Sequence, residues 1–140
     1  MIKFGACLLL ACFLAFAQTA PDVMAFFRTA AENLADDDFQ EFMKHFDPAM
    51  DGYSTLKNDV EALLAARDAE SVIEIIREDG DSQRRVLQLD WILTTGEKGA
   101  RNAQRSTKRV VVRCTIEQKA ERKSKAWKIT ALEPIDLFKP

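Results

Sequence analysis

Residues 105–132, RSTKRVVVRCTIEQKAERKSKAWKITAL, decide the fold. Apolar and polar residues alternate on either side of a charged segment, residues 119–124. The apolar positions are Val110, Val112, Cys114 and Ile116 before that segment, and Trp127, Ile129 and Ala131 after it. A period of two is typical of a β-strand with one buried face and one face toward water or a partner. The stretch therefore predicts two long antiparallel strands joined by a charged turn.

Helices are predicted in the first half of the chain. Apolar residues recur at helical spacing in residues 21–34, 39–46 and 54–68. Asp38 can cap the second of these helices and Ser54 the third. We therefore expect three helices before the first strand.

Two more strands are predicted between these helices and the hairpin. A β-branched run begins near Ser71, and an Asp-Gly turn at residues 79–80 separates it from a strand over residues 84–95. After the hairpin, residues 135–138 form an apolar tail that should dock onto the core. Helices followed by strands predict an α+β fold, with three N-terminal helices packed on one face of a curved antiparallel sheet of about four strands.

The first 17 residues have the layout of a secretory signal peptide. A short basic start precedes an apolar run at residues 4–16, and Ala15-Phe16-Ala17 is a small-x-small cleavage site. The run is too short for a transmembrane helix, which needs roughly 20 residues. We expect cleavage after Ala17, a single domain over residues 18–140, and export to the periplasm or the medium. Lipidation at Cys12 is the alternative.

A family resemblance rests on three segments. A helix over residues 23–34 leads through an acidic turn to Phe39-Gln40-Glu41-Phe42-Met43-Lys44-His45-Phe46-Asp47, and the chain closes with Ala126-Trp127-Lys128-Ile129-Thr130-Ala131-Leu132-Glu133-Pro134. The chain resembles the nuclear-transport-factor-2-like superfamily, in which a curved sheet wraps over helices as a cystatin-like cone. The resemblance is greatest to exported bacterial members without an assigned activity.

This resemblance implies a fold but no particular chemistry. The superfamily includes steroid isomerases, dehydratases, polyketide cyclases and epoxide hydrolases, which use Asp, His, Tyr or Arg inside the cone. Other members only bind ligands or mediate assembly. No residue set in this chain matches the motifs of the enzymes, so no catalytic role is transferred.

Asp90 is the acidic residue with the most unusual position. It lies between Leu89 and Trp91 in the middle of a predicted strand, where aspartate is disfavoured. Inside the cone it would be a general base, because burial raises the pKa of a carboxyl group. On the other face of the strand it would pair with Arg109 or Arg113, a contact that stabilises a sheet by about 0.2–1 kcal/mol. The polar pattern of the two arginines favours the ion pair.

The remaining chemistry-bearing residues predict neither a metal site nor a cofactor. Cys114 falls on the apolar side of its strand, as a buried small hydrophobe does. His45 is the only histidine and has no second ligand nearby, and the acidic turn at residues 36–38 is explained by helix capping. Tyr53, the only tyrosine, could line the mouth of the cone or serve as an amphipathic plug.

Charge is distributed unevenly along the chain. Residues 18–83 contain 16 acidic and 5 basic residues, whereas residues 84–140 contain 14 basic and 6 acidic residues. The basic run includes Arg101, Arg105, Lys108, Arg109 and Arg113. Nucleic acid is not expected as a partner, because exposed aromatic residues for stacking are absent from this run. A solvated strand face, or a surface for anionic lipid or polysaccharide, fits better.

These patterns predict an exported binding or assembly module. Its cavity would hold a small apolar ligand, lined by Tyr53, Asp90, Arg109 and Arg113, or its sheet face would form a homodimer. The alternative is a cofactor-free isomerase or hydratase-type enzyme with Asp90 as general base.

Overall fold

The computed structural model describes residues 20–100, 104–121 and 123–140. The predicted signal peptide, Cys12 and Arg101 lie outside these residues. Three helices come first: α1 (Pro21–Ala35), α2 (Phe39–Met43) and α3 (Tyr53–Ala66). Four strands follow, and a 3-10 turn closes the chain: β1 (Arg67–Gly80), β2 (Arg84–Glu97), β3 (Ser106–Glu121), β4 (Ser124–Glu133) and η1 (Ile135–Phe138). The predicted α+β fold, with N-terminal helices and a four-stranded sheet, is confirmed.

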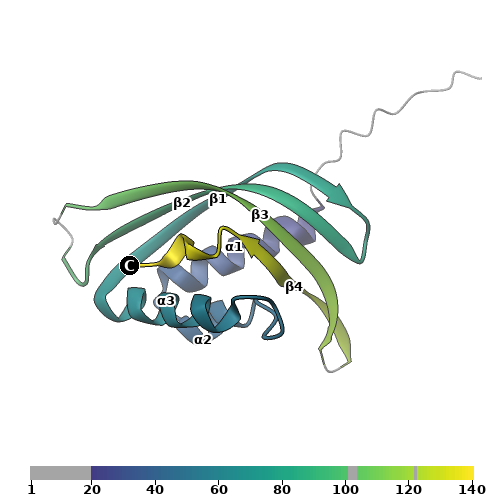
Figure 1. Cartoon of the computed structure of the whole chain (residues 1–140), viewed down its shortest axis with the longest axis horizontal. Coiled ribbons are helices and arrows are strands. Elements are labelled where there is room, and N and C mark those ends of the chain that lie inside the picture. Colours follow the sequence, from purple (N-terminus) through teal and green to yellow (C-terminus); the bar gives the residue numbers. More distant parts are fainter. Residues whose placement is uncertain (1–19, 101–103, 122) are drawn as a thin grey trace, which may run out of the picture.

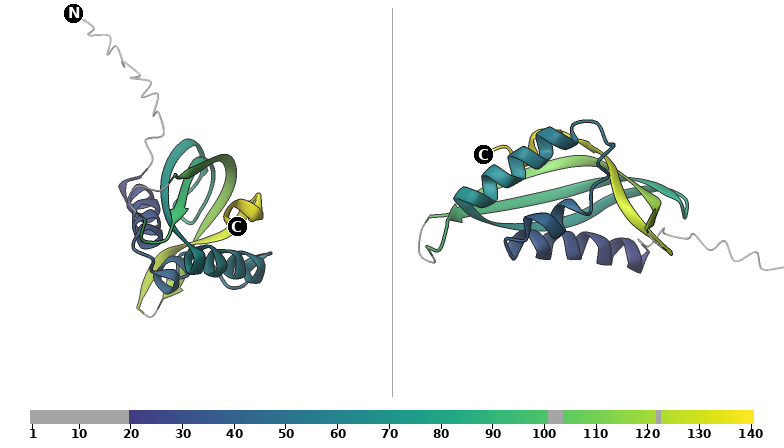
Figure 2. Two further views of the ribbon diagram at one scale, coloured as in Figure 1. Left: turned by 90° about the vertical axis from the view of Figure 1, so that its left-hand side faces the viewer. Right: turned by 90° about the horizontal axis from the view of Figure 1, so that it is seen from below.

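The strands form one antiparallel sheet in the order β1-β2-β3-β4. The sheet is open, with β1 and β4 at its two edges. Figure 1 shows the strands bending over the helices, which lie on one side of the sheet. From the helical side, Figure 2 shows α1 and α3 apart from each other, with α2 between them. Among the described residues, no helix is long and apolar enough to span a membrane.

The alternation in β2 and β3 explains which face of the sheet packs on the helices. Leu89 and Trp91 are fully buried, and so are Val112 and Cys114 on the neighbouring strand. The Trp91 indole nitrogen donates a hydrogen bond to the hydroxyl oxygen of Ser71, at 2.9 Å, which satisfies its polar group inside the core. The apolar positions of β2 and β3 are therefore the face that packs against the helices. In β4 the prediction for Ala131 is wrong, because a register shift between Thr115 and Ile116 places Leu132, and not Ala131, opposite the buried Cys114.

Four aromatic side chains fill the space between the sheet and the helices. The ring of Phe138 in η1 lies 5.4 Å from that of Trp91 and 5.5 Å from that of Phe42, edge to face in both cases. Phe42 also meets Phe46 at 5.3 Å. All four residues are at most 2 % exposed. The C-terminal tail thus docks onto the core as predicted.

Local chemistry sets the starts of α2 and α3. The Asp38 carboxylate accepts a hydrogen bond from the backbone N–H of Glu41, at 3.2 Å, as predicted for a cap. The prediction for Ser54 is wrong, since α3 begins at Tyr53 after Gly52. Gly52 has a φ of 79°, and a Cβ there would lie 2.9 Å from Ile135 Cγ1, so glycine suits this position.

The β4 edge is covered by the segment that follows α2. The backbone N–H of Asp47 donates to the Ile129 carbonyl, and the N–H of Ile129 donates to the His45 carbonyl, both at 2.8 Å. Phe46 forms a parallel bridge with Ile129. These contacts fix residues 45–47 beside β4 and place α2 and α3 next to the β3–β4 hairpin.

Candidate functional site

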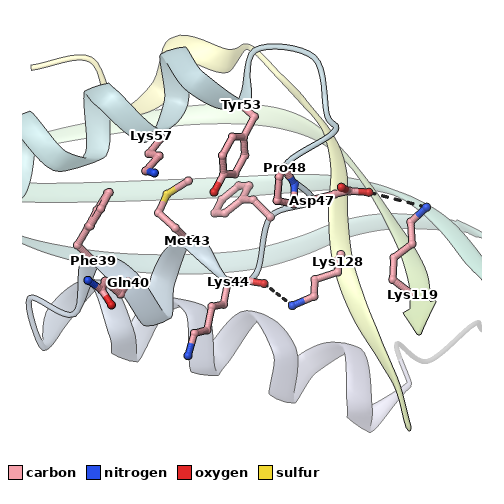
Figure 3. A pocket seen from close by; sticks show the side chains of 11 residues that line it. Phe39, Gln40, Met43, Lys44, Asp47, Pro48, Tyr53, Lys57, Lys119 and Lys128 are labelled. Atoms are coloured by element: carbon pink, nitrogen blue, oxygen red, sulfur yellow. Dashed lines mark hydrogen bonds and ion pairs between the residues drawn. The ribbon is translucent and has the colours of Figure 1, made fainter. Parts of the chain in front are cut away.

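A pocket of about 570 Å³ lies between α2, the loop after it, the start of α3 and the β3–β4 hairpin (Figure 3). Its lining is formed by eleven residues: Phe39, Gln40, Met43, Lys44, Phe46, Asp47, Pro48, Tyr53, Lys57, Lys119 and Lys128. Apolar side chains and lysines account for nine of them. We call it the lysine-rimmed pocket.

The floor of the lysine-rimmed pocket is apolar and recessed. Phe46 is 2 % exposed and Met43 5 % exposed, whereas Phe39 and Tyr53 are half-buried above them. In Figure 3 the Tyr53 ring extends from α3 toward Met43 and Pro48. The pocket therefore offers aromatic and thioether surface to a ligand, and this surface is recessed from the exterior of the protein.

The rim of the pocket carries its charge. Lys128 Nζ donates a hydrogen bond to the Lys44 carbonyl at 2.5 Å, and Lys119 Nζ lies 3.8 Å from Asp47 Oδ2. Lys44 Nζ pairs with Glu41 at 2.6 Å and points away from Tyr53 (Figure 3). Asp47 is the one carboxylate in the lining, so the rim is cationic.

Tyr53 is the predicted site residue that lies in this pocket. Asp90 and Arg109 lie instead on the face of the sheet that points away from the helices, which we call the outer face. Arg109 Nε donates to Asp90 Oδ1 at 3.0 Å, and Arg109 Nη2 donates to Asp90 Oδ2. Arg113, on the same face of β3, borders a separate hollow of about 740 Å³. The structure thus separates Tyr53 from the other three predicted residues.

The Asp90–Arg109 pair explains how aspartate is accommodated in a central strand. The Asp90 side chain is 5 % exposed, whereas that of Arg109 is 68 % exposed. Asp90 holds the pKa of the Arg109 guanidinium above its usual range, through the hydrogen bond first and its charge second. Both carboxylate oxygens accept from the guanidinium, which is a strong arrangement for a buried acid.

Large apolar side chains lie exposed beside this ion pair. Val72 is 56 % exposed and Val111 52 % exposed, and cross-strand pairing with Ile92 and Asp90 places both on the outer face. Ile76, at a β-bulge in β1, is 55 % exposed. Several large apolar side chains exposed on one face of a sheet favour a contact surface there.

His45 belongs to the segment that pairs with β4, and it is not among the residues of the lining. Its Nε2 lies 2.9 Å from Asn33 Oδ1, and its ring meets Phe26 edge to face at 5.0 Å. Burial, followed by the positive charge of Lys128, lowers the pKa of His45, and the Glu41 carboxylate opposes this. The folded state therefore favours the neutral imidazole.

We expect the stability of the protein to fall as the pH drops below about 6.5, in part because of His45. The pKa is lower in the folded state, so the unfolded chain binds the proton more readily, and the stabilisation present above the unfolded pKa is lost as pH falls through the folded one. Urea midpoints at about pH 7.5 and about pH 5.5 measure the loss. His45→Gln should show a smaller loss over this range; an equal loss in both proteins would contradict the prediction.

Cys114 is placed as a core residue. It is fully buried, and burial raises the pKa of its thiol. A thiol that stays protonated at neutral pH is a poor nucleophile. In the part of the chain that the structure describes, no three His, Cys, Asp or Glu side chains gather as metal ligands.

Sequence reasoning did not find most of the pocket. Phe39, Met43 and Phe46 read as the core face of a helix, and Lys57 and Lys119 lie far apart in the chain. One signal was available: Lys44 and Lys57 are two of the five basic residues in the acidic half. Only the folded structure places these two lysines next to Lys119 of β3 and Lys128 of β4.

No family model matches the chain, and no curated protein matches it in sequence. Solved structures match it in fold. A conserved protein from Planctomyces limnophilus is 7 % identical with a TM-score of 0.62, over 79 % of this chain and 90 % of that one. A cystatin-like protein of unknown function from Nostoc punctiforme is 11 % identical with a TM-score of 0.56, over 79 % and 85 %.

A third match carries a family name. It is a candidate dehydratase of the nuclear-transport-factor-2-like family from Streptomyces avermitilis, 10 % identical with a TM-score of 0.54, over 79 % of this chain and 90 % of that one. At these identities the likeness concerns the fold alone. The chain has a nuclear-transport-factor-2-like, cystatin-like fold, as the sequence resemblance predicted.

Proposed function

We propose that this protein is a small, exported, non-catalytic binding module, and that the lysine-rimmed pocket is its ligand site. The observation that carries the proposal is a recessed apolar floor, formed by Met43 and Phe46, with the rings of Phe39 and Tyr53 above it. Its volume of about 570 Å³ falls within the range of about 300–1,000 Å³ that is usual for small-molecule sites. The signal-like layout of residues 1–17 supports export.

Two features favour this pocket over an active site within a cone. The rings of Trp91 and Phe138 occupy the space between sheet and helices, where a cone-shaped relative would hold its substrate. Asp90, the candidate base of the alternative enzyme, is hydrogen-bonded through both oxygens to Arg109 on the outer face. The carboxylate is therefore engaged, and it points away from the helices.

Tyr53→Ala should weaken the binding of a neutral apolar dye, N-phenylnaphthylamine, by about fivefold, because the ring of Tyr53 supplies much of the pocket wall. Dye fluorescence on titration of the mature chain measures the affinity. Tyr53→Phe keeps the ring and serves as the matched control, with affinity unchanged. No saturable dye binding by the parent protein, or equal affinity in Tyr53→Ala, would reject the pocket as the site.

Assembly through the outer face is a second candidate function. The exposed Val72 and Val111 favour it, since a homodimer would remove both from water. If the protein is a dimer, Val72→Glu should lower its dimerisation affinity at least about tenfold, because a carboxylate flanked by Glu70 and Glu74 would be buried without a cation. Analytical ultracentrifugation measures this, with Thr55→Glu, exposed on α3 on the helical side of the sheet, as the control. A monomeric parent protein would exclude this function.

A further inference from the structure

We infer that the ligand of the lysine-rimmed pocket is an amphiphile with one apolar chain and an anionic head group. The inference rests on the proposed function, which it extends from an apolar ligand to a charged class of ligand. Three independent features of the pocket support it: the charge of its lining, the availability of its lysines, and its depth.

The lining concentrates positive charge in an acidic part of the molecule. It contains four lysines and one aspartate, although residues 18–83, which supply two of these lysines, hold 16 acidic and 5 basic residues. A cluster of cations around a concave surface raises the local concentration of anions. The pocket is therefore matched to a ligand that carries negative charge.

The four lysines differ in how far protein groups already engage them. Lys44 is held by Glu41, and Lys128 by the Lys44 carbonyl with Glu121 at 3.7 Å. Lys119 forms an ion pair with Asp47 at 3.8 Å but, unlike Lys44 and Lys128, it has no hydrogen bond within the described residues. Lys57 is exposed, and it has no ion-pair partner within the described residues. Lys57 and Lys119 are thus the two ammonium groups with capacity to bind an anionic head group.

The positions of Lys57 and Lys119 leave the apolar floor between them. In Figure 3, Lys57 extends from α3 beside Tyr53, and Lys119 extends from β3 on the far side of Asp47. A chain that lies on Met43 and Phe46 can therefore bring a terminal carboxylate or phosphate to a lysine at the rim. Long lysine stems add apolar contact while their charged ends stay in water.

The depth of the floor distinguishes a free amphiphile from a membrane surface. Met43 and Phe46 are nearly buried, and none of the large apolar side chains that are exposed in the described part of the chain belongs to the lining. A peripheral membrane protein inserts protruding apolar side chains into the bilayer. A single chain can enter the pocket, whereas a flat bilayer cannot reach its floor, so we assign the site to monomeric ligand.

Three ligands with the same chain length test the head group. Displacement of N-phenylnaphthylamine from the mature chain is measured with dodecanoate, dodecanol and dodecyltrimethylammonium, all as monomers. We expect dodecanoate to bind about tenfold more tightly than dodecanol at low salt, and the cation to bind most weakly. Because the contacts are exposed, the advantage of dodecanoate should shrink as the salt concentration rises.

A pair of variants tests the lysines. Lys57→Gln combined with Lys119→Gln should weaken dodecanoate binding about tenfold and leave dodecanol binding unchanged. Arg84→Gln combined with Lys139→Gln makes the same change in net charge outside the pocket, and it should bind dodecanoate like the parent protein. Both pairs replace exposed side chains, so the fold should be retained.

The outcomes separate failure of this inference from failure of the proposed function. Equal affinity for dodecanoate and dodecanol, or an equal effect of both variant pairs, would overturn the anionic ligand while leaving an apolar site in place. If neither the dye nor any of the three ligands binds, the pocket itself is rejected as the site. Binding to phosphatidylglycerol vesicles that is stronger than binding to monomeric dodecanoate, and lost in Lys57→Gln/Lys119→Gln, would assign the lysines to a membrane and also overturn the inference.

Discussion

Replacement of Phe138 by alanine is expected to lower the free energy of unfolding by about 3–5 kcal/mol, the usual cost of removing a buried phenylalanine ring. Phe138, the last residue of η1, is fully buried. Its ring contacts Trp91 from the sheet and Phe42 from α2, so its loss leaves a cavity between the two layers. Chemical denaturation followed by tryptophan fluorescence measures the change.

Two further variants show whether the effect belongs to the ring. Lys139→Ala replaces the exposed neighbour and should change stability by less than about 0.5 kcal/mol. Phe138→Leu retains part of the apolar volume, so its loss in the free energy of unfolding should lie between those of Lys139→Ala and Phe138→Ala. If Phe138→Ala unfolded at the same denaturant concentration as the parent protein, η1 would not be a part of the core.

The sheet was largely predictable because its signal is local. A strand with one buried face must alternate, so β2, β3 and β4 could be read from the apolar positions alone. The first residues of β1 could not. Arg67, Asp68 and Glu70 lack β-propensity, yet they pair with Glu97, Gly96 and Thr94 of β2. Here the neighbouring strand, which the local sequence does not describe, determines the conformation.

The candidate site was less predictable, because it is assembled from four separated segments. Tyr53 could be singled out as the only tyrosine, but nothing near it in sequence indicates Lys119 or Lys128. Residues 45–47 bring α2 next to β4 through the parallel bridge between Phe46 and Ile129. No local sequence pattern predicts this bridge. Side chains such as Met43 look like ordinary core residues until the depth of the pocket is known.

For Asp90, the sequence limited the choice to two environments, and the fold selected one. A carboxylate in a central strand needs a partner or a function. Arg109 lies on the adjacent strand, two residues along β3 from Val111, which is directly opposite Asp90. The guanidinium therefore spans the diagonal and reaches both carboxylate oxygens.

Arg109→Ala should lower the free energy of unfolding by about 1–3 kcal/mol, because it leaves the buried carboxylate of Asp90 without its hydrogen-bond donors. The Asp90 side chain is only 5 % exposed, so water replaces the guanidinium incompletely. Asp90→Asn should retain the fold with a smaller loss, since an amide is less costly to bury than an ion. Urea denaturation of the two single variants and of the double variant measures the coupling between the residues.

The double variant gives the decisive value. Once Asp90 is neutral, removal of the Arg109 guanidinium should lower the free energy of unfolding by less. The sum of the losses in the two single variants should therefore exceed the loss in the double variant. Arg113→Ala is the matched control: it lies on the same strand and face as Arg109, has no ion-pair partner in the described ranges, and should change stability by less than about 0.5 kcal/mol. Strict additivity, or an equal loss in Arg113→Ala, would show that the pair does not stabilise the outer face. Asp90 would then be a buried carboxylate without a structural role, and a catalytic role for it would again be the better explanation.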